Sequence, residues 1–261
     1  MSSTRIINVI LIALAVGLVA WGVTLVPVPA SQQPVPHILA GQQMPAGNYH
    51  YSETADYYTI DADYPATTTL QGAADIKARL TVEQAIAAQI AQFKQDGNFA
   101  NLTPEDVQIQ GLGPDRKYAL GMEYQEFPSA HYDSFLYAIY ADTLGAHPNG
   151  YFLTFVFDQT GATTTLASLF TPGSDYLTRL SQLATAQVLR QLDDRLGAGA
   201  ANEASLDGLA PTADNFQNFT IEGDTLHIFF PPYQVAAYAA GAFDVAIPLS
   251  SLSDILAPGV R

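Results

Sequence analysis

The chain has 261 residues, of which 48% are hydrophobic, and 10 Lys and Arg residues against 25 Asp and Glu residues give a formal net charge of -15. This composition excludes a globally disordered chain, and the charge excludes nucleic acid as a partner because an acidic surface repels phosphate backbones. The absence of cysteine excludes disulfides and thiolate metal sites.

The N-terminus carries a long apolar segment. Residues 6–26 begin with Ile6, end with Val26 and contain no charged residue, so the segment is long enough to span the roughly 30 Å of hydrocarbon in a bilayer. After residues 1–5, a short cytoplasmic stub that ends in Arg5, no basic residue follows until Lys77. The positive-inside rule therefore predicts a single-pass anchor with the N-terminus in the cytoplasm and the bulk of the chain outside it. The alternative is a signal peptide cleaved before Ser31, which would give a secreted or periplasmic protein.

The next segments indicate a spacer and the first strands. Residues 27–47 are rich in Pro and Gln and carry no charge, which is typical of an extended spacer. Residues 48–64 and 66–72 are rich in aromatic residues or Thr and predict strands, with Pro65 as the break between them.

A helix is predicted over residues 81–97. Thr81 and Gln84 match a capping box, and Gly97 matches the end of a helix. The apolar stripe of this helix consists of Ile86, Ile90 and Phe93.

Three strand candidates follow a polar loop, at residues 117–127, 132–142 and 150–158. The last two flank the turn-rich residues 143–148, so they are expected to pair in antiparallel fashion. A short helical turn is expected at residues 165–170.

Residues 175–196 predict the longest helix, with Ser174 as its N-cap. Residues 215–222 and 225–230 predict a hairpin closed by Gly223 and Asp224. The helix has one apolar face, made of Leu177, Leu180, Ala184, Val188, Leu192 and Leu196.

Helices that alternate with antiparallel strands predict the α+β class. We expect two small subdomains behind the anchor, at residues 48–158 and 159–256, each with helices packed on an antiparallel sheet.

Two stretches of this sequence resemble PdaC/RsiV-type extracytoplasmic proteins. Residues 145–170 contain a Gly-Ala-His turn, an aromatic strand, Asp-x-Thr-Gly and Leu-x-x-Leu-Phe. Residues 226–249 contain Phe-Pro-Pro-Tyr-Gln-Val and Ala-Tyr-Ala-Ala-Gly, and they resemble the C-terminal RsiV-type domain of unknown function. The resemblance covers roughly residues 49–256.

The resemblance implies two known roles. RsiV-type proteins are membrane anti-sigma factors whose outer domain binds lysozyme, and PdaC-type proteins are peptidoglycan deacetylases with a separate catalytic module. The five residues before the apolar segment are too few for a sigma-binding domain. No two of the five His residues have the His-x-x-x-His spacing of a deacetylase metal site. We therefore expect a module that faces the cell envelope and has neither a sigma-binding domain nor a deacetylase catalytic module.

The candidate ligand-binding residues lie in two segments. His147 follows Gly-Ala in a turn, where an imidazole can bind a ligand or order the turn by hydrogen bonds to its backbone. Pro231 and Pro232 force a turn after an apolar strand, and the tyrosines that follow form either an aromatic lip for sugar rings or a protein partner, or a packed sheet corner. The candidates are His147, Asn149, Tyr233, Gln234 and Tyr238.

Catalytic and metal sites find less support in the sequence. No Gly-x-Ser-x-Gly elbow, His-Glu-x-x-His or Walker loop occurs. A zinc site built from His131, His147 and Glu123 or Glu126 matches no known spacing. The cluster of Asp56, Asp61 and Asp63 lacks the pattern of an EF-hand and indicates a solvated strand face.

We expect no catalytic residue, metal or cofactor. The leading hypothesis is a membrane-anchored binding or sensing module of the cell envelope, which recognises a cell-wall component or a protein such as lysozyme. The alternatives are a wall-glycan hydrolase that uses paired carboxylates and a non-catalytic envelope scaffold.

Overall fold

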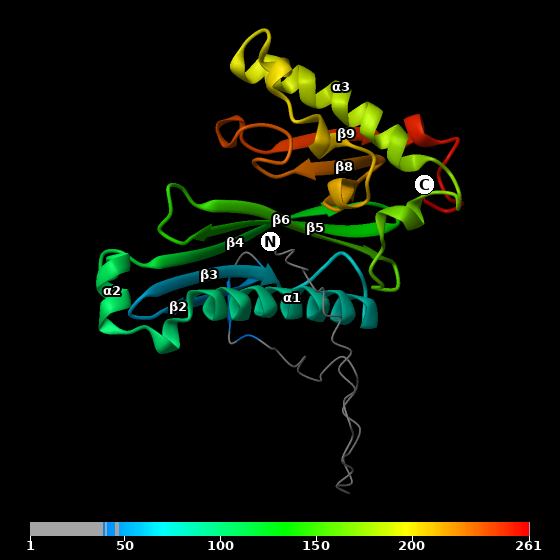
Figure 1. Cartoon of the computed structure of the whole chain (residues 1–261). Helices are drawn as coiled ribbons and strands as arrows, with labels where there is room; N and C mark the ends of the chain where they lie inside the picture. Colours follow the sequence, from blue (N-terminus) through cyan, green and yellow to red (C-terminus); the bar gives the residue numbers. More distant parts are fainter. Residues whose placement is uncertain (1–38, 40, 45–46, 261) are drawn as a thin grey trace, which may run out of the picture. The chain divides into compact units, whose positions relative to one another are not determined.

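The computed structural model describes residue 39, residues 41–44 and residues 47–260. The predicted anchor at residues 6–26 and most of the predicted spacer lie outside these residues. Within the described part of the chain, no helix is long and apolar enough to cross a membrane. The described residues form helices packed on a six-stranded and a three-stranded sheet, so the α+β class is confirmed (Figure 1).

The larger sheet has the strand order β1-β2-β3-β4-β5-β6. All neighbours are antiparallel except β3 and β4, which are parallel. The expectation of purely antiparallel sheets is therefore wrong at this pair, because the helix between the two strands returns the chain to the same end of the sheet. The strands are β1 Gln42–Gln43, β2 Asn48–Thr54, β3 Tyr58–Pro65, β4 Tyr118–Pro128, β5 Tyr132–Asp142 and β6 Asn149–Asp158.

The crossover helix α1 spans Ala73–Gly97 and covers one face of this sheet (Figure 1). The predicted capping box at Thr81 is wrong, since the helix begins eight residues earlier and the Thr81 hydroxyl donates to the carbonyl of Lys77 at 2.9 Å. The run Ala-Ala-Asp-Ile-Lys-Ala-Arg-Leu before Thr81 is made mostly of helix-favouring residues, which explains the earlier start. The predicted stripe is buried and is extended by two residues: Ala78, Val82, Ile86, Ile90 and Phe93.

Residues 66–72 form a loop instead of the expected strand. Side chains from neighbouring elements hold the loop, because Asp75 accepts a hydrogen bond from the Thr68 amide at 2.8 Å and Asp133 accepts one from the Thr69 amide at 2.7 Å. These bonds replace the ladder that a strand would have formed. A short helix, α2 Pro104–Gln110, precedes β4.

The smaller sheet consists of β7 Phe219–Glu222, β8 Thr225–Phe230 and β9 Phe243–Pro248, all antiparallel. The predicted hairpin is confirmed, with Gly223 at φ 52° in its turn. Between β8 and β9 the chain passes through the Pro231-Pro232 turn and a 3-10 turn at Tyr238–Ala240.

Helix α3, Tyr176–Leu196, lies along β8 and β9 (Figure 1). Two expectations about it are wrong. Asp175 and not Ser174 is the N-cap, and α1 has 25 residues whereas α3 has 21. The expected apolar face is buried in its central part, at Leu180, Ala184, Val188 and Leu192, while Leu196 at the C-terminal end is 56% exposed.

The two sheets contact each other through polar and aromatic side chains. The amide of Ile221 donates to Ser134 Oγ at 3.2 Å, and the amide of Phe219 donates to Thr154 Oγ1 at 3.2 Å. The ring of Phe229 lies 5.7 Å from that of Phe127. These contacts place the β8–β9 connection beside the β5–β6 turn, where the candidate site lies.

Candidate functional site

His147, Tyr233 and Tyr238 form one aromatic cluster. His147 comes from the β5–β6 turn and the two tyrosines come from the β8–β9 connection. The rings of His147 and Tyr238 stack with centroids 4.1 Å apart and an interplanar angle of 17°. The Tyr233 ring lies 5.4 Å from that of Tyr238 and 5.6 Å from that of His147. Three of the five predicted site residues are therefore brought together.

Hydrogen bonds fix the imidazole of His147 in one orientation. Its Nδ1 lies 3.0 Å from the carbonyl of Pro148 and its Nε2 lies 2.6 Å from the hydroxyl of Tyr233. A carbonyl only accepts, so Nδ1 carries a proton and donates to it, while Nε2 shares the hydrogen bond with the tyrosine hydroxyl. The contact with the Pro148 carbonyl is the kind expected if His147 orders its own turn. The bond to Tyr233 also links the turn to a segment that is distant in the chain.

Tyr233 is the exposed member of the cluster. It is 58% exposed and its φ is 73°, a left-handed conformation that bulky residues rarely adopt. Pro231 and Pro232 end the strand before it, and the Gln234 amide closes the turn on the Pro231 carbonyl at 3.2 Å. An unusual backbone conformation thus presents an aromatic ring to solvent.

Gln234 anchors the Pro231-Pro232 turn by side-chain hydrogen bonds to backbone carbonyls of a neighbouring segment. Its side-chain amide donates to the carbonyl of Gly208 at 3.1 Å and to the carbonyl of Asn215 at 2.9 Å. A Cβ atom added to Gly208 would lie 1.8 Å from the Gln234 carbonyl oxygen, so only glycine fits there. Because backbone carbonyls engage both amide donors, Gln234 positions Tyr233, and its side-chain oxygen is the group left for a ligand.

A groove of about 490 Å³ adjoins the cluster at Pro232. Aromatic and small residues of β4, β5 and β6 form one side, and Pro232 and Ala242 form the other. Its lining includes Tyr140, which is 48% exposed, and Phe152. This mostly apolar groove continues the aromatic surface between the two sheets.

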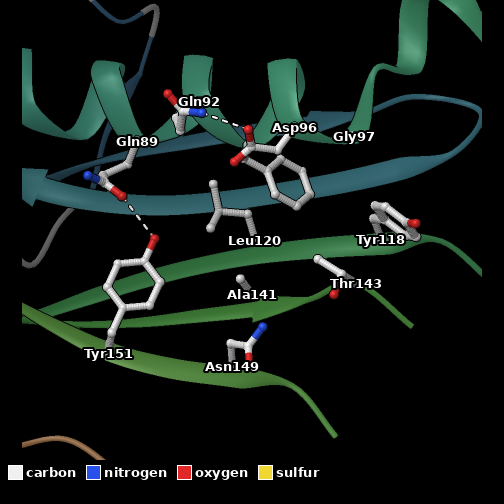
Figure 2. Close-up of a pocket in the computed structure, with 11 residues that line it drawn as sticks. Gln89, Gln92, Asp96, Gly97, Tyr118, Leu120, Ala141, Thr143, Asn149 and Tyr151 are labelled. Carbon is white, nitrogen blue, oxygen red and sulfur yellow. Dashed lines mark hydrogen bonds between the residues drawn. The ribbon is translucent and has the colours of Figure 1, made fainter. Parts of the chain in front are cut away.

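Asn149 belongs to a different site. It lines a pocket of about 320 Å³ between α1 and the strands β4 to β6, on the sheet face that α1 covers (Figure 2). Asn149 and Tyr151 alternate with Gly150 along β6, so they point to the face opposite the groove. The sequence placed His147 and Asn149 in one site because they are close neighbours in the chain.

Glu126 and Asp133 form a carboxyl pair that the sequence reasoning missed. Asp133 has no exposed surface, and its Oδ2 accepts the amide of Thr69. Burial, together with the charge of Asp133, raises the pKa of Glu126 to about 7. The sequence could have indicated this pair. Side chains alternate between the two faces of a strand, and by that alternation Glu126 on β4 and Asp133 on β5 fall on the inward face.

Two of the other histidines, His50 and His227, contact acidic side chains. His50 lies 2.7 Å from Asp63 and His227 lies 3.0 Å from Asp244. Among the residues that the structure describes, no group of three or more His, Asp or Glu side chains is arranged to hold a metal ion.

Comparison with known proteins finds a family match within the C-terminal part of the chain. Residues 167–250 match the model of DUF3298, a protein family of unknown function. This stretch is similar to a DUF3298 domain. This match, and the similarity to a relative that bears the PdaC name, confirm the expected resemblance to PdaC/RsiV-type proteins.

That relative is the peptidoglycan-N-acetylmuramic acid deacetylase PdaC of Bacillus subtilis (strain 168). It is 36% identical over 114 residues, which cover 43% of this chain and 23% of the relative. The similarity therefore spans about a quarter of the deacetylase.

Two crystal structures of DUF3298 proteins share the fold. One, from Bacteroides fragilis NCTC 9343, has a TM-score of 0.56 and 19% identity, and the match covers 80% of this chain and 92% of the other. The second, from Pseudomonas aeruginosa PAO1, has a TM-score of 0.56 and 13% identity, with coverage of 87% and 97%. At these identities the likeness is one of fold.

Proposed function

We propose that this chain is an extracytoplasmic protein of the cell envelope that binds the glycan of peptidoglycan without cleaving it. The similarity to a peptidoglycan deacetylase over 114 residues supports a substrate of this class. The apolar residues 6–26 support attachment to the membrane with residues 27–261 outside the cytoplasm.

The observation that carries the proposal is the aromatic cluster of His147, Tyr233 and Tyr238. Stacking on His147 holds the Tyr238 ring, and the Tyr233 hydroxyl is tied to the same imidazole. Aromatic rings with few rotatable bonds offer apolar faces and a polar tip at a small cost in entropy. Such faces suit the C–H faces of sugar rings, and the adjoining groove extends the surface along a glycan strand.

The carboxyl pair does not support the hydrolase alternative. A glycosidase needs both carboxyl groups beside the scissile bond. Asp133 is fully buried in the sheet beneath the residue 66–72 loop. A bound sugar would contact aromatic rings at the cluster and would not contact this pair.

Alanine variants of the cluster test the proposal. Tyr233→Ala and Tyr238→Ala should each weaken binding of soluble glycan fragments by about ten-fold, since each removes a stacking surface. Ile109→Ala is the matched control, because Ile109 is a 76% exposed apolar residue on α2. Unchanged affinity in both tyrosine variants, with wild-type melting, contradicts the assignment of the site.

Lysozyme is a second candidate partner. A net charge of -15 attracts basic proteins, and the exposed Tyr233 ring offers an anchor of the kind enriched at protein interfaces. A protein partner held through this anchor should lose affinity in Tyr233→Ala at high salt, whereas attraction by net charge alone disappears as salt is added.

A further inference from the structure

The pocket beneath α1 is open because one of its floor residues is small (Figure 2). Leu120, Ala141 and Asn149 are cross-strand neighbours on β4, β5 and β6 and form a row across the floor. Further along β5, Ile139 and Tyr137 fill the space under the helix. At Ala141 no large side chain does so, and a volume of about 320 Å³ remains. This volume is at the low end of the range for small-molecule sites.

Helix α1 supplies a polar wall. Gln89, Gln92 and Asp96 are three and four residues apart, so they lie on one face of the helix. All three line the pocket, and Phe93 between them is buried and completes the apolar part. Figure 2 shows Gln89 and Tyr151 directed toward each other across the pocket.

These polar groups keep free hydrogen-bonding capacity. The Tyr151 hydroxyl donates to Gln89 Oε1 at 2.8 Å, which leaves the Gln89 amide donors. Gln92 Nε2 donates to Asp96 Oδ1 at 2.7 Å, which leaves Gln92 Oε1 and Asp96 Oδ2. The Asn149 side chain makes no hydrogen bond to another residue in the part of the chain that the structure describes. Donors and acceptors thus line the same small space.

The charges of the lining select against anions. Among the described residues that line the pocket, none is basic and Asp96 alone is acidic. The nearby Lys94 is engaged with Glu53 at 2.5 Å. An anionic ligand would lie beside Asp96 with no counter-charge.

We propose that this pocket binds a neutral sugar of one or two rings. The amides of Gln89, Gln92 and Asn149 and the carboxylate of Asp96 bind its hydroxyl groups, while Leu120 and the buried Phe93 contact its apolar face. This site is separate from the aromatic cluster and goes beyond the function proposed for that cluster.

The test is a titration of the full chain with four probes. N-acetylglucosamine and its β-1,4-linked disaccharide are the neutral sugars, glucosamine is the cation and glucuronic acid is the anion. We expect the neutral sugars to bind and glucuronic acid not to bind. Asn149→Ala and Asp96→Ala should each weaken binding of the neutral sugars by about ten-fold, the loss expected for one or two hydrogen bonds.

Two further variants keep the result interpretable. Ala141→Leu fills the floor of the pocket and should abolish sugar binding in this pocket at an unchanged melting temperature, while binding of glycan fragments at the aromatic cluster is retained. Tyr233→Ala removes a ring of the aromatic cluster and separates the two sites, because it leaves this pocket intact. The proposal is overturned if the neutral sugars do not bind, if glucosamine alone binds, or if binding is lost in Tyr233→Ala and retained in Asn149→Ala.

Discussion

Glu126 and Asp133 place two carboxyl groups together beneath the residue 66–72 loop. Burial, and then the charge of Asp133, raises the pKa of Glu126 from its ordinary value of 4.5 to about 7. The folded protein therefore binds a proton that the unfolded chain releases at lower pH. The contribution to stability is complete below about pH 4.5 and is lost as the pH rises to about 7.

Glu126→Gln should remove this pH dependence. The neutral amide has nearly the same shape and does not repel Asp133, so we expect the variant to be more stable than the wild type at pH 8 by about 1–3 kcal/mol. At pH 4 the two proteins should have nearly equal unfolding free energies. Chemical denaturation between pH 4 and pH 8 measures both, with the exposed Glu123→Gln on the same strand as control. A variant less stable than the wild type at pH 8 contradicts the account.

The residues of the candidate site were partly predictable from sequence. Pro231 and Pro232 marked the turn, and the tyrosines after it were visible as an aromatic segment. The hydrogen bond between His147 and Tyr233 was not predictable, because 86 positions separate the two residues and only the packing of the sheets joins them. The positioning role of Gln234 depends on its bond to the Gly208 carbonyl, 26 positions away in the chain, which no local pattern indicates.

At the scale of elements, α1 is attached to β2 by a network around one carboxylate. Glu53 Oε2 contacts Lys94 Nζ at 2.5 Å, and Glu53 Oε1 accepts the hydroxyl of Tyr58 at 2.6 Å. Burial alone would raise the pKa of Glu53, but the bonds from Lys94, Tyr51 and Tyr58 outweigh it and lower the pKa to about 2. The stabilisation is present above pH 4.5 and is lost as the pH falls toward 2.

Lys94→Met should lower the unfolding free energy by about 1 kcal/mol at pH 7, a modest value because the side chains of Lys94 and Glu53 are 34% and 28% exposed and solvent screens them. The difference from wild type should shrink below pH 4. Lys77→Met, at an exposed position on the same helix, controls for the loss of a positive charge. An equal effect of the two substitutions is evidence against the network.

Most elements could be read from local patterns because their residues alternate or repeat with the period of a strand or helix. The strands of the β5–β6 pair and of the β7–β8 hairpin fall within a few residues of their expected bounds. The start of α1 was misplaced since Thr81 resembles a cap by sequence alone. The parallel pairing of β3 with β4 depends on the path of α1 across the sheet, which a residue pattern does not contain.

At the scale of the whole chain, the proposed location depends on residues 6–26. A variant that lacks these residues should move from the membrane fraction to the soluble fraction, because the whole apolar segment of the proposed anchor is removed. Immunoblots of separated fractions measure this, and washing with concentrated salt distinguishes insertion from surface adsorption. Retention of the shortened chain in washed membranes would contradict the anchor.

The central claim is that this protein binds wall glycan through the aromatic cluster. The most direct measurement is a calorimetric titration of the full chain with soluble peptidoglycan glycan fragments and, in parallel, with lysozyme. Each titration is made at about 0.1 M and about 1 M salt, because the screening length falls from about 10 Å to about 3 Å between these concentrations. We predict glycan binding of similar affinity at both salt concentrations, because ring stacking is not screened, and lysozyme binding that is lost at the higher one. Absence of glycan binding at both concentrations would contradict the claim. If lysozyme binding also persists at about 1 M salt, a protein is indicated as the partner of this surface.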